Sequence, residues 1–183
     1  MLGQGISEDQ SAIFEEKLSY FDEHERCPGH LTHKVKYQNT LISDPKKIDE
    51  DYYRSLLMID EDCAELSDHV TGKHIQFMVL IEAARQMVNA VTEKYYSDRS
   101  KIFLAKNIGV QFSNFVYPFK TEMNYKVLDK KIKIGGNREM SVEIEFVQWG
   151  KSVSKFNMTF TILSRDFVTE LENKSINSAI YGA

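Results

Sequence analysis

One stretch of the chain, from His74 to Tyr96, constrains the fold more than any other. It has few helix breakers and many good helix formers, so it predicts a helix of about six turns. The first half of this segment is apolar nearly all round, which is typical of a helix that is buried on most of its sides. Such a helix needs a second layer, for example a sheet, to cover it.

A single polar stripe interrupts this apolar helix. Glu82, Arg85, Gln86 and Asn89 are spaced i, i+3, i+4 and i+7, so their side chains project from one face. Burial raises the pKa of a carboxyl and a neighbouring guanidinium lowers it, which makes Glu82 beside Arg85 a candidate acid or base. A structural ion pair without chemistry is the alternative, and both interpretations are compatible with the sequence.

The segments on both sides of this helix alternate apolar and polar residues, which predicts strands. Upstream we expect one strand over residues 32–44 and another over Tyr52–Ile59. Downstream lie four more candidates, separated by turn residues: Ile102–Val116, Met123–Ile134, Met140–Trp149 and Val153–Leu163. One buried helix between two strands and a four-strand antiparallel meander is an α+β layout, the hotdog fold, in which a curved sheet wraps around one central helix.

The length of 183 residues fits one domain with flanking extensions. We expect an N-terminal helical extension over residues 1–30, which opens at the capping residue Ser7. A single hotdog domain should span residues 31–165, followed by a C-terminal tail, 166–183, with a short helical pattern around Phe167. Hotdog sheets leave an edge strand exposed, so we expect two copies to pair edge to edge as a homodimer.

Charge and composition exclude several classes of partner. The formal charge of -4 provides no basic footprint for nucleic acid. No apolar run is long enough for a membrane span, and the amino terminus lacks the pattern of a secretory signal. The chain has only two cysteines, so no disulfide framework is expected and the predicted location is the cytoplasm.

Residue types that bind metals recur at steps of three near the amino terminus: His24, Cys27, His30 and His33. Pro28-Gly29 breaks any helix that would align them, and the paired cysteine spacings of zinc sites are missing. The sequence also contains no glycine-rich phosphate loop and no serine nucleophile elbow. We therefore expect neither a metal nor a cofactor.

The start of the central helix resembles a known signature. Residues 67–86 read SDHVTGKHIQFMVLIEAARQ. This is similar to the A-factor biosynthesis (AfsA-like) hotdog family, in which an Asp-His-Val segment, a Gly and a Leu-x-Glu-Ala-Ala-Arg-Gln run open the central helix. His33-Lys34 with the segment 39–44 resembles the family's first strand, and the segment 112–118, FSNFVYP, resembles the strand after the helix. Three motifs in the right order make the match specific.

The resemblance implies an enzyme that acts on acyl thioesters carried by an acyl carrier protein or by coenzyme A. The family is associated with condensing a β-ketoacyl thioester with dihydroxyacetone phosphate on the way to butyrolactone or butenolide signals. More distantly, the helix resembles that of the 3-hydroxyacyl-carrier-protein dehydratases, in which a His before the helix and a Glu on it perform acid-base chemistry. His69 and Glu82 occupy comparable positions and, with Arg85, are the predicted catalytic residues.

Substrate-binding residues are predicted around the same helix: His74, Phe77, Met78, Gln86 and Asn114. Unpaired amides at a helix N-terminus suit a thioester carbonyl or a developing oxyanion. Phe77 stands where the AfsA-like pattern usually has Gly. For both His69 and His74 the alternative is a capping or loop histidine, and for Asn114 it is an ordinary strand residue.

Two other functions stay open. One is a dehydratase or thioesterase that uses Glu82 and His69 without a phosphorylated cosubstrate. The other is a non-catalytic module that binds an acyl group or a carrier protein, which is favoured if Phe77 fills the mouth of the acyl tunnel.

Overall fold

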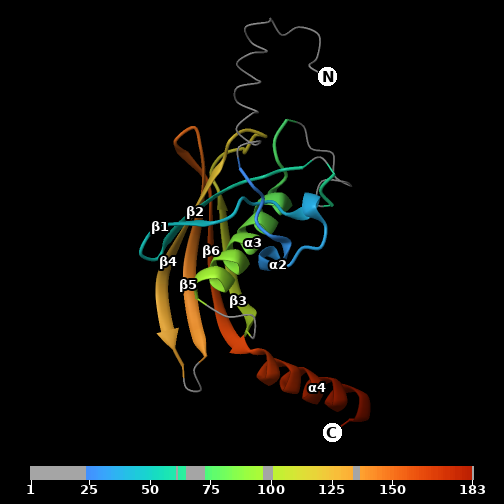
Figure 1. The fold of residues 1–183 in the computed structure, drawn as a ribbon. Coiled ribbons are helices and arrows are strands. Elements are labelled where there is room, and N and C mark those ends of the chain that lie inside the picture. The colour runs from blue at the N-terminus through green and yellow to red at the C-terminus, as the bar shows by residue number, and fades with distance from the viewer. Residues whose placement is uncertain (1–23, 61, 65–72, 97–100, 134–136, 183) are drawn as a thin grey trace, which may run out of the picture.

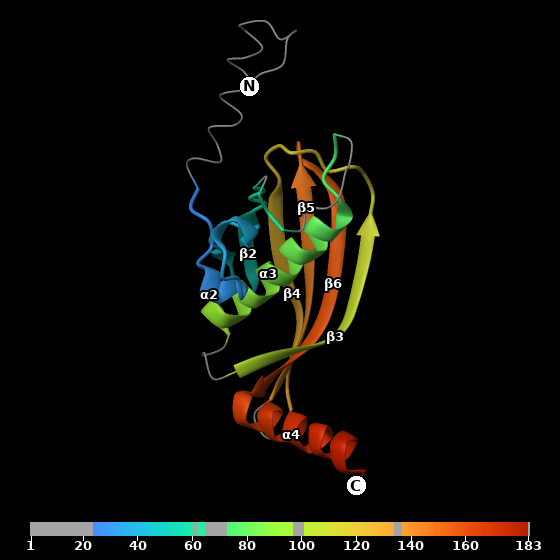
Figure 2. The same cartoon turned by 90° about the vertical axis from the view of Figure 1, so that its right-hand side faces the viewer.

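The computed structural model describes residues 24–60, 62–64, 73–96, 101–133 and 137–182. Within these ranges one antiparallel sheet has the strand order β1-β2-β4-β5-β6-β3. Its strands are β1 (Lys46–Asp49), β2 (Tyr52–Leu56), β3 (Lys101–Phe112), β4 (Glu122–Ile132), β5 (Arg138–Gln148) and β6 (Lys151–Ser164). Helix α3 (Phe77–Tyr95) packs against one face of this sheet, with the short helix α2 (Gly29–Thr32) beside it (Figures 1 and 2). A sheet around one central helix confirms the predicted hotdog class.

Helix α3 occupies the centre of the core because apolar residues surround most of its circumference. Its buried residues include Val79, Leu80, Ala83, Ala84, Met87, Val88, Ala90 and Val91, each at most 2% exposed. The core side chains contributed by the sheet are large and include Tyr125, Ile144, Phe146, Phe156 and Phe160, each at most 2% exposed. Small alanines on the helix leave room for these rings, as close packing of an interior requires.

The predicted meander is only partly correct. Strands β4, β5 and β6 are consecutive neighbours, but β3 pairs with β6 and not with β4. The β5–β6 connection is a tight turn at Trp149 and Gly150, which both have positive φ, so these two strands must be adjacent. The connection between β3 and β4, residues 113–121, is longer and reaches across to the other side of the meander. Strand β3 is therefore an edge strand.

The strand predicted over residues 32–44 is wrong. The segment instead holds the end of α2, a 3₁₀ turn over Tyr37–Asn39 and isolated bridges at Ile42 and Ser43. Leu41 and Ile42 are both fully buried, so neighbouring side chains do not alternate between two faces. Backbone groups that a strand partner would bind are taken by the Gln86 side chain, which accepts from the Leu41 amide and donates to the Asn39 carbonyl.

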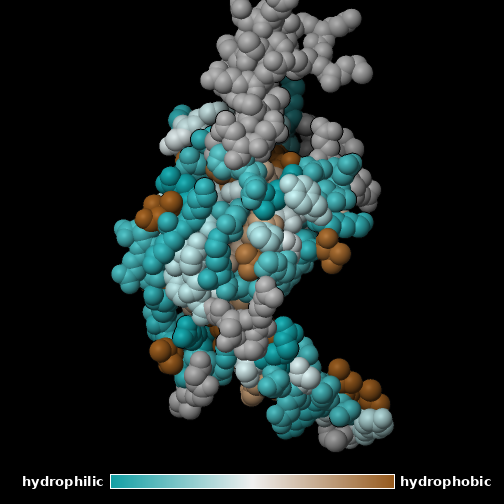
Figure 3. All heavy atoms as spheres, viewed as in Figure 1, coloured by the Kyte–Doolittle hydropathy of each residue, from teal (hydrophilic) through white to brown (hydrophobic). Residues whose placement is uncertain are grey.

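The C-terminal tail is a longer helix than its pattern predicted. Helix α4 spans Arg165–Tyr181, is capped by Ser164 and ends at Gly182, whose φ is +67°. It has no buried residue and runs away from the sheet (Figure 1). Apolar atoms are exposed at its outer end (Figure 3), where the helix sequence includes Ile180, which is 64% exposed. The leading helix predicted from Ser7 lies outside the described residues. No helix in the described ranges is both long and apolar enough to cross a membrane.

Gln86 provides the first test of this fold. Its side chain is fully buried and hydrogen bonds at 2.8 Å to both Leu41 and Asn39. Gln86→Leu leaves a buried amide and a buried carbonyl unpaired, so it should lower the free energy of unfolding by about 2–4 kcal/mol. Urea unfolding followed by circular dichroism measures the change. Gln38→Leu, in the 3₁₀ turn and with no comparable contacts, is the control, and equal stability of the two variants would contradict the assignment.

Candidate functional site

The polar stripe of α3 converges on the Glu82 carboxylate. Arg85 donates two hydrogen bonds to it, from Nε to Oε2 at 2.7 Å and from Nη2 to Oε1 at 2.6 Å. The Nζ atom of Lys34 lies 2.8 Å from Oε1, and Gln86 Nε2 donates to the same oxygen at 3.0 Å. One carboxylate thus gathers two cations and an amide, in a position where its side chain is only 16% exposed.

These contacts decide the ionisation of Glu82. Burial raises the pKa of its carboxyl, but the hydrogen bonds from Arg85, Lys34 and Gln86 and the charge of Arg85 outweigh burial. The net effect lowers the pKa from 4.5 to about 2. Glu82 is consequently a carboxylate at neutral pH, a strong hydrogen-bond acceptor but a weak base.

The segment after α2 attaches to the rest of this stripe. The Thr32 carbonyl accepts from Arg85 Nη2 at 3.3 Å, and His33 Nε2 lies 2.6 Å from the Glu93 carboxylate. His33 is the C-cap of α2 and has φ of +58°, the left-handed conformation, which directs the chain back toward α3. Its ring lies nearly parallel to that of Phe103 on β3, with centroids 6.3 Å apart. One histidine therefore bridges α2, α3 and the edge strand.

A cavity of about 560 Å³ opens next to this stripe. Its walls are mainly apolar and come from α3, β3 and β6, with Val88, Ile102, Phe103, Ala105, Ile108, Met158 and Phe160. Its polar lining consists of Asn89, His33 and the three cations Arg85, Lys101 and Arg165. No described Asp or Glu lines it. An apolar chamber with a cationic rim suits an amphipathic ligand that carries an anionic group.

A smaller pocket of about 240 Å³ lies at the N-terminus of α3. It is lined by His74 before the helix, by Phe77 and Leu80 in its first turns, and by Phe112 at the end of β3 with Asn114 and Phe115 after it. The His74 ring lies 4.8 Å from that of Phe115, and Phe77, which is 55% exposed, makes an edge contact with Phe112. The side chain of the N-cap residue Gln76 makes no capping hydrogen bond, and the Gln76 carbonyl accepts from the Val79 amide. Amides at a helix start of this kind suit a carbonyl oxygen.

A comparison of the sequence with protein-family models shows to which family the chain belongs. The A-factor biosynthesis hotdog domain model, AfsA, matches residues 19–164, most of the chain. The chain belongs to the AfsA hotdog family. The match includes the central helix, both pockets except for Arg165, and all of the predicted site residues. A comparison with curated proteins finds no match.

Solved structures similar to this AfsA-family chain support the same fold. A conserved protein from Pseudomonas aeruginosa has a TM-score of 0.53 at 17% identity, covering 74% of this chain and 100% of its own. A mutant thioesterase from the same organism has a TM-score of 0.52 at 9% identity, covering 90% and 99%. A thioesterase from Haemophilus influenzae has a TM-score of 0.50 at 12% identity, covering 73% and 95%. At these identities the likeness is one of fold.

The residues predicted from the AfsA-like signature fall into two groups. Glu82, Arg85 and Gln86 form one hydrogen-bonded network, whereas His74, Phe77 and Asn114 surround the smaller pocket. Met78 is 48% exposed and lines neither pocket. His69 lies outside the described residues. The predicted residues thus divide between the charged network around Glu82 and the aromatic pocket at the start of α3.

Four polar residues near the stripe were not predicted as site residues: His33, Lys34, Lys101 and Arg165. His33 and Lys34 belong to a motif that resembles the family, but they were interpreted as strand residues. Lys101 and Arg165 stand at the ends of predicted strands, and only the pairing of β3 with β6 brings them together. That non-neighbouring pairing has no signal in the sequence.

The histidine and cysteine run near the amino terminus forms no metal site in the described part of the chain. No three His, Cys, Asp or Glu side chains there are close enough to hold an ion. Cys27 is buried, and burial together with Asp44 raises the pKa of its thiol to about 12. A thiol with that pKa is protonated at neutral pH, and the thiol is a much weaker nucleophile than the thiolate.

The lowered pKa of Glu82 predicts a pH-dependent stability. A depressed carboxyl pKa stabilises the fold fully above the unfolded value, 4.5, and the contribution is lost as the pH falls through about 2. Glu82→Gln should therefore lower the free energy of unfolding by about 1–2 kcal/mol near pH 7, allowing for solvent screening. The difference from wild type should shrink between pH 4.5 and about 2.

Denaturant unfolding of both proteins at several pH values measures this dependence. Glu50→Gln, an exposed change in the turn between β1 and β2, is the control and should alter stability little throughout. If the stability difference between Glu82→Gln and wild type stays constant down to about pH 2, the carboxylate is not the stabilising species.

Proposed function

We propose that this protein processes acyl thioesters, and specifically that it transfers a β-ketoacyl group from a carrier-protein or coenzyme A thioester to a dihydroxyacetone phosphate-type cosubstrate. Membership of the AfsA family supports this choice, and the thioesterases among proteins of similar fold support the thioester class. The structural observation that carries the proposal is the 560 Å³ cavity beside the α3 stripe. It combines apolar walls for an acyl chain with a cationic rim for a phosphate.

The reaction needs a nucleophile, an oxyanion site and a proton acceptor. The cosubstrate hydroxyl attacks the thioester carbonyl carbon, the carbon-sulfur bond breaks, and the departing thiolate takes up the proton that the hydroxyl releases. The amides at the start of α3, beside His74 and Phe77, suit the developing oxyanion. His69, which precedes the helix, remains the predicted base for the hydroxyl proton.

We assign Glu82 a positioning role and not an acid-base role. Its pKa of about 2 makes it a poor proton acceptor at neutral pH. Its contacts fix Arg85, which lines the cavity, and hold Lys34 at the same carboxylate. The acid-base role that the dehydratase resemblance implies would need a pKa much closer to neutrality.

Glu82→Gln distinguishes these two roles. For a positioning residue, kcat/KM should fall about tenfold to a hundredfold because the cations shift, while the pH profile keeps its shape. The measurement is the rate of thiol release from an acyl-pantetheine across the pH range, corrected for the folded fraction. If the Glu82→Gln variant instead loses the acidic or the basic limb of the plot of kcat/KM against pH, the proton transfer belongs to this carboxylate.

Products separate the proposed reaction from its alternatives. The purified protein should convert a β-ketoacyl-pantetheine and dihydroxyacetone phosphate to a phosphorylated ester, detected by mass spectrometry. Free acid formed without the cosubstrate would favour a thioesterase, the activity named for two of the proteins of similar fold. Loss of water from a hydroxyacyl substrate would favour a dehydratase. Binding without turnover would favour a non-catalytic module.

The exposed edge of the sheet supports a homodimer. Strand β3 pairs only with β6 in the described structure, and its apolar residues Leu104, Ile108, Val110 and Phe112 are each at least 37% exposed. Edge pairing with a second copy would satisfy the open backbone groups and cover these side chains. It would also bring two copies of the cavity next to one interface, because β3 forms one of its walls.

Sedimentation tests the dimer. The protein should sediment at twice the 21.2 kDa mass of one chain. Leu104→Asp on β3 should weaken association, whereas Leu128→Asp on β4 should not, although the two leucines are similarly exposed, at 52% and 54%. A wild-type monomer with no concentration dependence would contradict the edge pairing.

A further inference from the structure

Two cations at one end of the 560 Å³ cavity have no side-chain partner among the described residues. Lys101 is the first residue of β3 and pairs in register with Ser164, so Arg165, the next residue, lies beside it. Both side chains line the cavity, and neither forms an ion pair or hydrogen bond with a described residue. Two neighbouring like charges repel each other, so their adjacency does not stabilise the fold.

The position of Arg165 in its helix gives a second argument. Arg165 is the first residue of α4, where the helix dipole is positive and disfavours a cation. Ser164 already caps the helix by accepting from the Phe167 amide, so the arginine is not required for capping. Helix stability therefore does not explain a guanidinium at this position, whereas an anion bound in the cavity would.

Arg85, the third cation that lines the cavity, is in a different situation. Its Nε and Nη2 atoms already bind both oxygens of Glu82, which is the two-pronged contact that a phosphate would need. Lys101 and Arg165 have no such carboxylate among the described residues that line the cavity. The cavity thus contains one neutralised cation and two available ones.

We infer that Lys101 and Arg165 bind the phosphate group of the substrate, while the walls formed by Ile102, Phe103, Met158 and Phe160 hold its organic part. This assignment rests on the proposed function and names the phosphate-binding residues of the same site. The phosphate belongs either to the pantetheine arm of the acyl donor or to the small cosubstrate. Both present anionic phosphate oxygens to the two cations.

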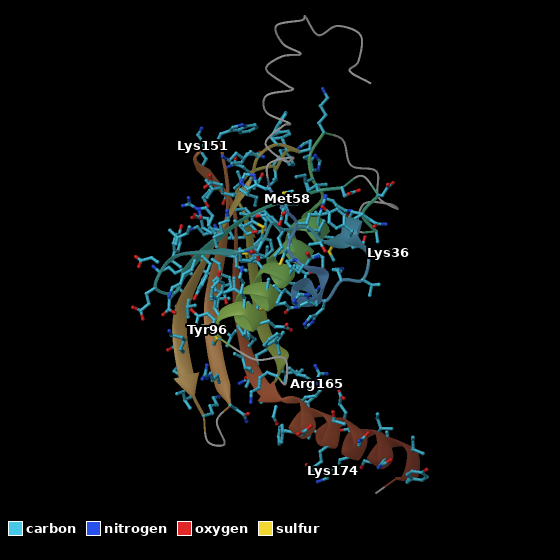
Figure 4. All side chains as sticks on the ribbon, viewed as in Figure 1. Lys36, Met58, Tyr96, Lys151, Arg165 and Lys174 are labelled. Carbon is cyan, nitrogen blue, oxygen red and sulfur yellow. The ribbon has the colours of Figure 1, made fainter. Side chains whose placement is uncertain are left out.

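Calorimetric titration with three probes tests the inference. The probes are a hexanoyl thioether of pantetheine, the same thioether of phosphopantetheine, and glycerol phosphate. Lys101→Gln and Arg165→Gln should each weaken binding of a phosphorylated probe about tenfold, the scale for a charged hydrogen bond at a partly exposed site. Neither variant should change binding of the unphosphorylated thioether. Lys151→Gln, at the opposite end of the sheet, is the matched control (Figure 4).

Which probes bind more weakly to the two variants shows which substrate carries the bound phosphate. If it comes from the donor, wild type should prefer the phosphopantetheine thioether, and both variants should lose that preference. If it comes from the cosubstrate, the two thioethers should bind equally, and only glycerol phosphate should respond to the variants.

Phosphorylated probes that bind Lys101→Gln, Arg165→Gln and wild type equally would overturn the inference. Failure of wild type to bind either thioether, with glycerol phosphate still sensitive to both cations, would instead overturn the acyl thioester proposal and leave the phosphate site standing.

Discussion

The arrangement around α3 depends on the need to neutralise one carboxylate on an apolar helix. Glu82 is mostly buried, and a buried charge is costly unless it is paired and hydrogen-bonded. Arg85 and Gln86 satisfy it from the same helix, and Lys34 does so from the segment after α2. The pairing therefore does more than neutralise charge, because it attaches Thr32 and Lys34 to the helix on either side of His33, which lines the cavity. Removing the carboxylate should loosen this attachment before it affects the core.

The same network divides the site into parts with different tasks. Because Arg85 is occupied by Glu82, it shapes the border of the cavity more than it attracts an anion. The cationic attraction comes from Lys101 and Arg165, which reach the cavity from β3 and from the start of α4. The helix N-terminus, about one and a half turns from Glu82, offers amides beside an aromatic pocket. An acyl-transfer enzyme needs these three elements: a chamber for the acyl donor, a site for the anion and a site for the oxyanion.

Much of this arrangement was predictable from the sequence, and the parts that were not have a common physical cause. The central helix and strands β4, β5 and β6 have strong local periodicity, and the short connections between those three strands determine how they pair. The strand prediction for residues 32–44 was wrong because the backbone of this segment hydrogen bonds to the side chain of Gln86, which is distant in sequence. No local pattern in the sequence indicates such a contact. Glu82 and Arg85 were predicted to lie on one face, but the contribution of Lys34 depends on the path of that same segment. Lys101 and Arg165 were missed because β3 crosses to the far edge and pairs with β6.

We propose that the Glu82 carboxylate stays ionised at neutral pH, where it positions neighbouring cations and does not transfer protons. The most direct measurement is a nuclear magnetic resonance titration of the Glu82 side-chain carboxyl, labelled with carbon-13 and assigned by comparison with Glu82→Gln. The resonance should not change between pH 8 and pH 4. The midpoint of its titration should lie near pH 2, because Arg85, Lys34 and Gln86 lower the pKa of this carboxyl. A midpoint at or above the ordinary glutamate value of 4.5 would contradict it and would return Glu82 to the role of general acid or base.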